Sequence, residues 1–103
     1  MPKSVFVQDT ITVQIAESSL WPAFEVDLKP LNREEYGKVQ AQLARVPADM
    51  VYAEVFGPMV ERQVRSWNLE EPANPLNFAR LHPALIDRLA NILLNGYGGI
   101  LKN

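Results

Sequence analysis

Two short segments near the start of the chain alternate strictly between apolar and polar side chains. They cover residues 10–15 and 24–29. A period of two predicts half-buried β-strands with one face in water. Residues 16–23 between them are too few for a crossover helix, so the two strands should pair antiparallel as a hairpin. Residues 5–7 (VFV) could add a short third strand, which would place the hairpin region at about residues 5–29. The apolar positions of the two alternating segments are Ile11, Val13, Ile15, Phe24, Val26 and Leu28.

The next segment has the spacing of three and four that is typical of an amphipathic helix. We expect this helix at about residues 32–46, with Asn32 as N-cap and Glu35 completing a capping box. Leu31 and Tyr36 are placed to form a hydrophobic staple, and Pro47 should end the helix. Its predicted apolar stripe is Tyr36, Val39, Leu43 and Val46.

Two further helices are predicted at about residues 49–67 and 83–95. The first contains Gly57 and Pro58, so we expect a kink or a split there, because proline removes a donor and clashes with the preceding turn. The second begins with Pro83 at its first position. The predicted stripes are Phe56, Val60, Val64 and Trp67 in the first helix, and Leu85, Ile86, Leu89, Ile92 and Leu93 in the second. Residues 68–77 should be a surface loop and residues 96–103 a loose tail.

These elements predict a single α+β domain over residues 1–103. An isolated two-stranded hairpin is only marginally stable, so its apolar face needs a helical cover. We therefore expect an N-terminal antiparallel β-hairpin, with three short strands if residues 5–7 take part, packed on a bundle of three to four α-helices. The composition, 48% hydrophobic and 21% charged, is typical of a globular protein with its own core.

The charge pattern and the composition exclude several classes of protein. A net charge of −2 without a basic run argues against nucleic-acid binding. No window approaches the ~18 apolar residues of a membrane span, and the N-terminal residues lack the pattern of a signal peptide. There is no cysteine for disulfides, thiol catalysis or the common zinc motifs. We expect a protein of the cytoplasm that binds neither membrane nor nucleic acid.

No residue pattern indicates catalysis. His82, the only histidine, precedes Pro83 and should cap a helix rather than bind a metal. The serines lack the nucleophile-elbow pattern, and the glycine-rich residues 96–99 lack the lysine of a phosphate-binding loop. The pairs Glu34–Glu35 and Glu70–Glu71 are typical of solvated surface. We therefore expect no enzyme, no cofactor and no metal site.

Apolar side chains are the better candidates for function. Trp67 should anchor the end of its helix against residues 68–77. Trp21, beside Leu20 in the hairpin loop, either folds back over the core or remains exposed as a contact residue. Core packing is the default for the last helix, but its broad apolar face and the tail could instead bind another chain. The candidate partner-binding residues are Leu20, Trp21, Leu85, Leu89, Ile92, Leu93, Ile100 and Leu101.

Two parts of the sequence resemble the tail assembly chaperones of long-tailed (lambda-like, siphovirus) bacteriophages and prophages. Residues 64–69 (VRSWNL), a loop rich in proline and asparagine, and residues 76–89 (LNFARLHPALIDRL) resemble the C-terminal half of that family. Residues 28–35 (LKPLNREE), which lead from a strand into a helix, are similar to its N-terminal half.

This resemblance implies a non-enzymatic protein of virion assembly. Such chaperones bind the tape measure protein, keep it soluble and help to recruit tail tube subunits, and many are also made in a longer, frameshifted form. The alternative is a structural virion protein, a tail or head–tail connector component, that acts by homo-oligomerisation.

Overall fold

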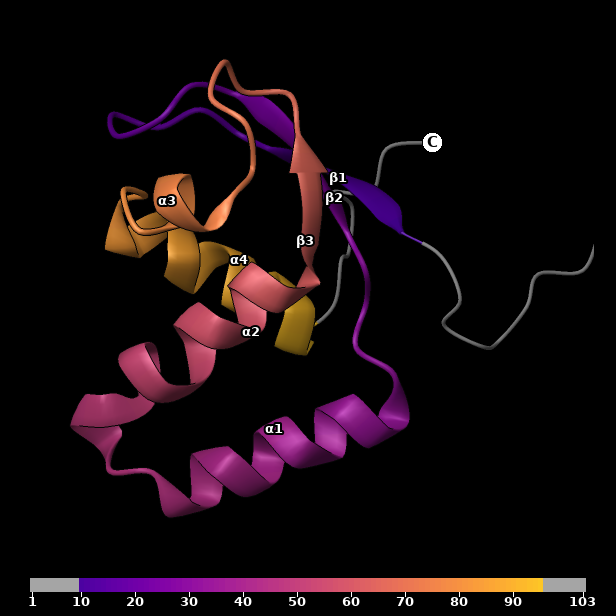
Figure 1. The fold of residues 1–103 in the computed structure, drawn as a ribbon, viewed down its shortest axis with the longest axis vertical. Helices are drawn as coiled ribbons and strands as arrows, with labels where there is room; N and C mark the ends of the chain where they lie inside the picture. Colours follow the sequence, from indigo (N-terminus) through magenta and orange to yellow (C-terminus); the bar gives the residue numbers. More distant parts are fainter. Residues whose placement is uncertain (1–9, 96–103) are drawn as a thin grey trace, which may run out of the picture.

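The computed structural model describes residues 10–95, and within them a three-stranded antiparallel sheet packs against a helical layer (Figure 1). The predicted α+β fold class is confirmed. The strands are β1 (Ile11–Ile15), β2 (Phe24–Leu28) and β3 (Val64–Trp67). The helices are α1 (Arg33–Arg45), α2 (Gly57–Gln63), α3 (Pro75–Phe78) and α4 (Pro83–Asn95), together with a 3₁₀ turn, η1 (Ala48–Met50), and a π-helix, η2 (Tyr52–Phe56). The predicted strand at residues 5–7 and the predicted loose tail at 96–103 lie outside the described residues.

The hairpin forms as predicted. Strands β1 and β2 pair antiparallel, with Ile15 opposite Phe24 and Val13 opposite Val26. The apolar set faces the core, and Val13 and Val26 are completely buried. On the other face, Asp27 accepts hydrogen bonds of 2.6 Å from Thr12 of β1 and from Ser66 of β3. One side of the sheet is therefore apolar and packed, and the other carries polar contacts across all three strands.

The third strand comes from a segment that was predicted as the end of a helix. The prediction of a helix through residue 67 is wrong, because α2 ends at Gln63 and residues 64–67 pair with β2. In that pairing Ser66 lies opposite Asp27 and Val64 lies opposite Leu28, so Arg65 forms a bulge. The bulge turns both Val64 and Trp67 toward the core, although residues three apart in a regular strand face opposite sides. Two core-facing residues of this strand are therefore three positions apart in the sequence, as they would be on one face of a helix.

The predicted disruption at Gly57 and Pro58 takes the form of a π-helix. The amide of Gly57 donates to the carbonyl of Tyr52, five residues earlier. Pro58 has no amide hydrogen for the carbonyl of Glu54, four residues before it, so a regular α-helical ladder cannot continue through this point. The wide π turn accommodates the proline, and α2 then carries the chain to β3.

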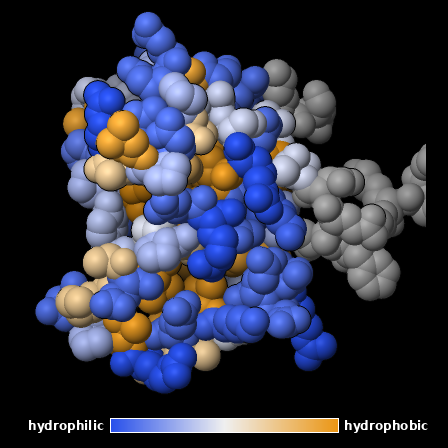
Figure 2. All heavy atoms as spheres, in the orientation of Figure 1, coloured by the Kyte–Doolittle hydropathy of each residue, from blue (hydrophilic) through white to orange (hydrophobic). Residues whose placement is uncertain are grey.

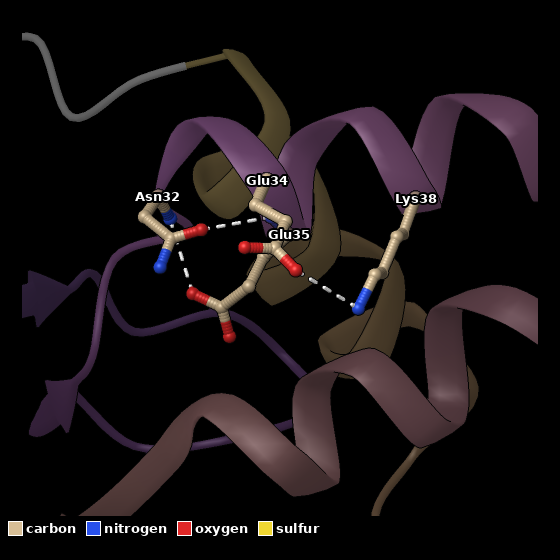
Figure 3. A network of polar contacts seen from close by, with 4 residues as sticks. All are labelled: Asn32, Glu34, Glu35 and Lys38. Carbon is tan, nitrogen blue, oxygen red and sulfur yellow. Dashed lines mark hydrogen bonds and ion pairs between the residues drawn. The ribbon is translucent and has the colours of Figure 1, made fainter.

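Helix α1 begins as predicted but is only lightly attached to the rest of the fold. Asn32 accepts from the amide of Glu35 at 2.8 Å, and the Glu35 side chain accepts from the amide of Asn32 at 3.1 Å (Figure 3). Val39 is the one buried residue of the helix. Tyr36, predicted in the apolar stripe, is 42% exposed, so its place in the buried face of the helix was predicted wrongly. Figure 1 shows α1 as the outermost layer of the molecule.

The core lies between the apolar face of the sheet and helices α2 and α4. Helix α4 spans the predicted residues 83–95 and supplies the largest share of buried side chains. They are Leu85, Ile86, Leu89, Ala90, Ile92 and Leu93. Among residues 10–95, no helix combines the length and the apolar character needed to cross a membrane.

Candidate protein-binding surfaces

The predicted partner-binding residues of the last helix form core instead of surface. Leu85, Leu89, Ile92 and Leu93 are 3%, 0%, 5% and 5% exposed. Helix α4 needs its broad apolar face because it packs against α2 and η2 and shares one hydrophobic core with the strands. These four residues are therefore not available to a partner in the folded chain. Ile100 and Leu101 lie outside the described residues.

The hairpin loop keeps the two other predicted residues near the surface. A tight turn forms where the amide of Ser18 donates to the carbonyl of Trp21 at 2.9 Å, and the Ser18 hydroxyl accepts from the amide of Leu20 at 3.0 Å. The indole of Trp21 donates to the carbonyl of Ala16 at 2.9 Å, and its ring packs at the margin of the core. Trp21 is thus folded back and half-buried, whereas Leu20 is 53% exposed.

A hollow of about 600 Å³ opens at the base of this loop. Its apolar part comes from the last residue of β1, the first residue of β2 and two flanking alanines, and its polar part from the sheet edge. We call it the hairpin hollow, and its lining residues are Gln14, Ile15, Ala16, Ala23, Phe24, Glu25 and Asn68. Ala16 links the hollow to Trp21, because it lines the hollow and accepts the hydrogen bond of the indole. We use the name hairpin surface for the hollow together with Trp21 and the exposed Leu20 of the same turn.

Asn68 fixes the rim of the hairpin hollow and was not singled out by its sequence. Its amide donates to the carbonyl of Glu25 at 3.1 Å, and its side-chain oxygen accepts from the amide of Glu25 at 2.7 Å. The side chain thereby extends the β2–β3 pairing beyond the end of β3. The sequence offers only one sign of this role, which is an asparagine directly after residues 64–67. Because those residues were predicted to be helical, the sign could not be used.

A second open surface lies between α1 and α2. This α1–α2 groove has a volume of about 550 Å³ and is lined by Glu35, Lys38, Val39, Ala41, Gln42, Arg45 and Arg62. Figure 2 shows hydrophobic side chains in the space between α1 and the layer above it, bordered by hydrophilic ones. Three lining residues are cations and one is a carboxylate. Lys38 also forms an ion pair of 3.3 Å with Glu34, and both side chains are largely exposed (Figure 3).

His82 and Trp67 have structural roles, in agreement with their predicted ones. The ring nitrogen Nδ1 of His82 accepts from the amide of Ala84 at 3.0 Å, which caps α4. The Trp67 ring packs on Phe78 with a centroid distance of 5.1 Å, and its indole donates to the carbonyl of Glu71. Trp67 therefore closes the loop as predicted, although from a strand. Within residues 10–95 no three metal-ligating side chains cluster.

No family model matches the chain, and no curated protein or solved structure is significantly similar to it. The two surfaces themselves are therefore the basis for an argument about function.

Proposed function

We propose that this chain is a non-enzymatic tail assembly chaperone of a long-tailed bacteriophage or prophage. In this proposal it binds the tape measure protein in the host cytoplasm through the hairpin surface and assists the recruitment of tail tube subunits. The observation that carries the proposal is the exposed Leu20 beside Trp21 in a hairpin loop whose base opens into the partly apolar hairpin hollow. The similarity of residues 28–35 and 64–69 to such chaperones supports it.

The hairpin surface has the properties needed to hold an amphipathic helix. A partner helix binds such a site by placing its apolar side chains in a hollow while its polar side remains in water. The turn at residues 18–21 is fixed by its own hydrogen bonds, so little conformational entropy is lost when Leu20 is covered. Complete burial of a leucine side chain stabilises by about 1.5–3 kcal/mol. Since Leu20 is about half-exposed, we expect it to contribute about 1 kcal/mol to binding.

Co-expression with the tape measure protein of the same phage or prophage tests the proposal. The wild-type chain should raise the soluble fraction of the tape measure protein. Leu20→Ser should reduce that effect, because about 1 kcal/mol corresponds to roughly fivefold in affinity. Leu76→Ser is the matched control, since Leu76 is 72% exposed but lies in α3, outside the hairpin surface. The proposal fails if the wild-type chain leaves the tape measure protein insoluble.

The competing proposal is a structural tail or head–tail connector component. A connector or tail component should be found in purified virions in a fixed ratio to the major tail protein, and a chaperone that acts only during assembly should not. Quantitative mass spectrometry of purified particles separates the two.

A further inference from the structure

Strand β1 forms one edge of the sheet, and its outer side has no partner strand among residues 10–95. The strands follow each other in the order β1-β2-β3, and β1 pairs with β2 alone. An edge strand presents a row of main-chain N–H and C=O groups that another polypeptide can bind. The outer edge of β1 is therefore a candidate site for contact with a partner.

The hydrogen bonds of the sheet identify the main-chain groups that face this outer edge. The carbonyl of Glu25 accepts at 3.1 Å from the residue that follows β3, so the main-chain groups of Glu25 face β3. Successive residues of a strand direct these groups to opposite sides. Val26 therefore bonds toward β1, where it lies opposite Val13. Thr12 and Gln14, on either side of Val13, consequently direct their N–H and C=O groups away from β2.

The outer edge of β1 lacks the features that usually prevent strand addition. Natural edge strands are often very short, bulged, charged or interrupted by proline. Strand β3, at the other edge of the sheet, has only four residues and carries the exposed Arg65 in its bulge. Strand β1 has five residues, ITVQI, with no charge and no proline, and its register with β2 is regular. Within the described part of the chain, one edge is thus protected and the other is open.

The chemistry of this edge selects an extended segment as its ligand. Main-chain groups at strand spacing are complementary to another strand, whereas a helix satisfies its own main-chain groups internally. In an antiparallel pair, directly opposite residues lie on the same face of the sheet. Residues opposite Thr12 and Gln14 would lie on the polar face, and residues opposite Ile11 and Val13 on the apolar face. Ile11 is only half-buried, so an apolar residue opposite it would cover it further.

We propose that the outer edge of β1 binds an extended, uncharged segment of another protein as an antiparallel fourth strand. The segment alternates polar and β-branched apolar residues, and its main chain bonds to Thr12 and Gln14. Main-chain hydrogen bonds supply the affinity in this kind of recognition, and the alternate side chains supply the selectivity. This is a second mode of binding beyond the one proposed for the hairpin surface. It needs neither Leu20 nor Trp21, so it holds or fails independently of the proposed function.

Hydrogen–deuterium exchange of the full chain, followed by nuclear magnetic resonance, tests the edge directly. In the free chain the amides of Thr12 and Gln14 should exchange fast, and the amide of Val13 should exchange slowly. The probe is a capped peptide of alternating threonine and valine with a lysine at each end. At about 1 mM it should slow the exchange of Thr12 and Gln14. If these two amides are already protected without peptide, the edge is filled by the chain itself or by a second copy, and the proposal is overturned.

A main-chain substitution and a modified peptide make the test specific. Gln14→Pro removes one outward amide, at a position where an edge strand tolerates proline, and should weaken peptide binding at least about fivefold. Gln14→Ala is the matched control, because it removes the side chain and keeps the amide. Methylation of the peptide's threonine amides, which would face β1, should abolish binding, and methylation of its valine amides should not. Circular dichroism checks that each variant is folded. Equal binding by the proline and alanine variants, or by the two methylated peptides, contradicts strand addition.

Discussion

Gln63 and Lys29 are joined by two hydrogen bonds that tie the end of α2 to the end of β2. The amide of Lys29 donates to the main-chain carbonyl of Gln63 at 2.8 Å, and the Gln63 side-chain amide donates to the carbonyl of Lys29 at 2.7 Å. Asn68 makes an equivalent pair of contacts with Glu25 at the other end of β3. Two amide side chains thus hold both ends of a strand of four residues against β2. Short, bulged strands pair weakly, so these contacts explain why residues 64–67 remain in the sheet.

Gln63→Ala should destabilise the fold by about 1–3 kcal/mol, because the carbonyl of Lys29 loses its hydrogen-bond donor. The site is buried, since Gln63 is only 1% exposed. Chemical unfolding in urea measures the change. Gln63→Met keeps most of the side-chain volume without a donor, so it should recover only the packing part. Gln40→Ala on the exposed side of α1 is the control and should change stability by less than about 0.5 kcal/mol. Equal effects at positions 40 and 63 would show that the contact with Lys29 contributes nothing.

The sequence predicts the elements whose signals are local. Alternation alone places Val13 and Val26 on the buried side, and it leads to the observed hairpin. Asn32, with Glu35 three residues later, locates the start of α1 because a capping box is closed within four residues. Helix α4 follows from its proline start and its apolar face.

The parts that the sequence does not predict depend on tertiary contacts. Val64 and Trp67 have a helical spacing in the sequence, and only the bulge opposite Leu28 makes that spacing compatible with a strand. The role of Asn68 depends on the strand that brings it to Glu25. The α1–α2 groove depends on how α1 and α2 are placed relative to each other, which no local pattern specifies. The apolar stripe predicted for α1 also wrongly includes the exposed Tyr36.

Helix α1 should open locally when its cap is removed. Asn32→Ala removes the acceptor for the amide of Glu35, and the loss of such a cap costs about 1 kcal/mol. Val39 is the only buried side chain of α1, so the helix should fray without unfolding the core. Hydrogen–deuterium exchange should therefore accelerate at the amides of residues 33–37, while residues 85–93 keep their protection. Asn32→Asp, which preserves the acceptor, should behave like the wild type. Faster exchange in α4 as well would mean that α1 and the core unfold together.

The assignment of α4 to the core leads to a contrast between two leucines. Leu89 is 0% exposed, and its replacement by alanine should cost about 2–5 kcal/mol through lost burial and the cavity left behind. Leu20→Ala at the hairpin tip should change the free energy of unfolding by less than about 0.5 kcal/mol, because Leu20 is 53% exposed. Thermal and urea unfolding of the two variants measure the difference. If α4 instead served as a partner surface that the core did not need, Leu89→Ala would leave the isolated protein as stable as Leu20→Ala does. The two substitutions thus distinguish a leucine that builds the core from one that is exposed at the surface.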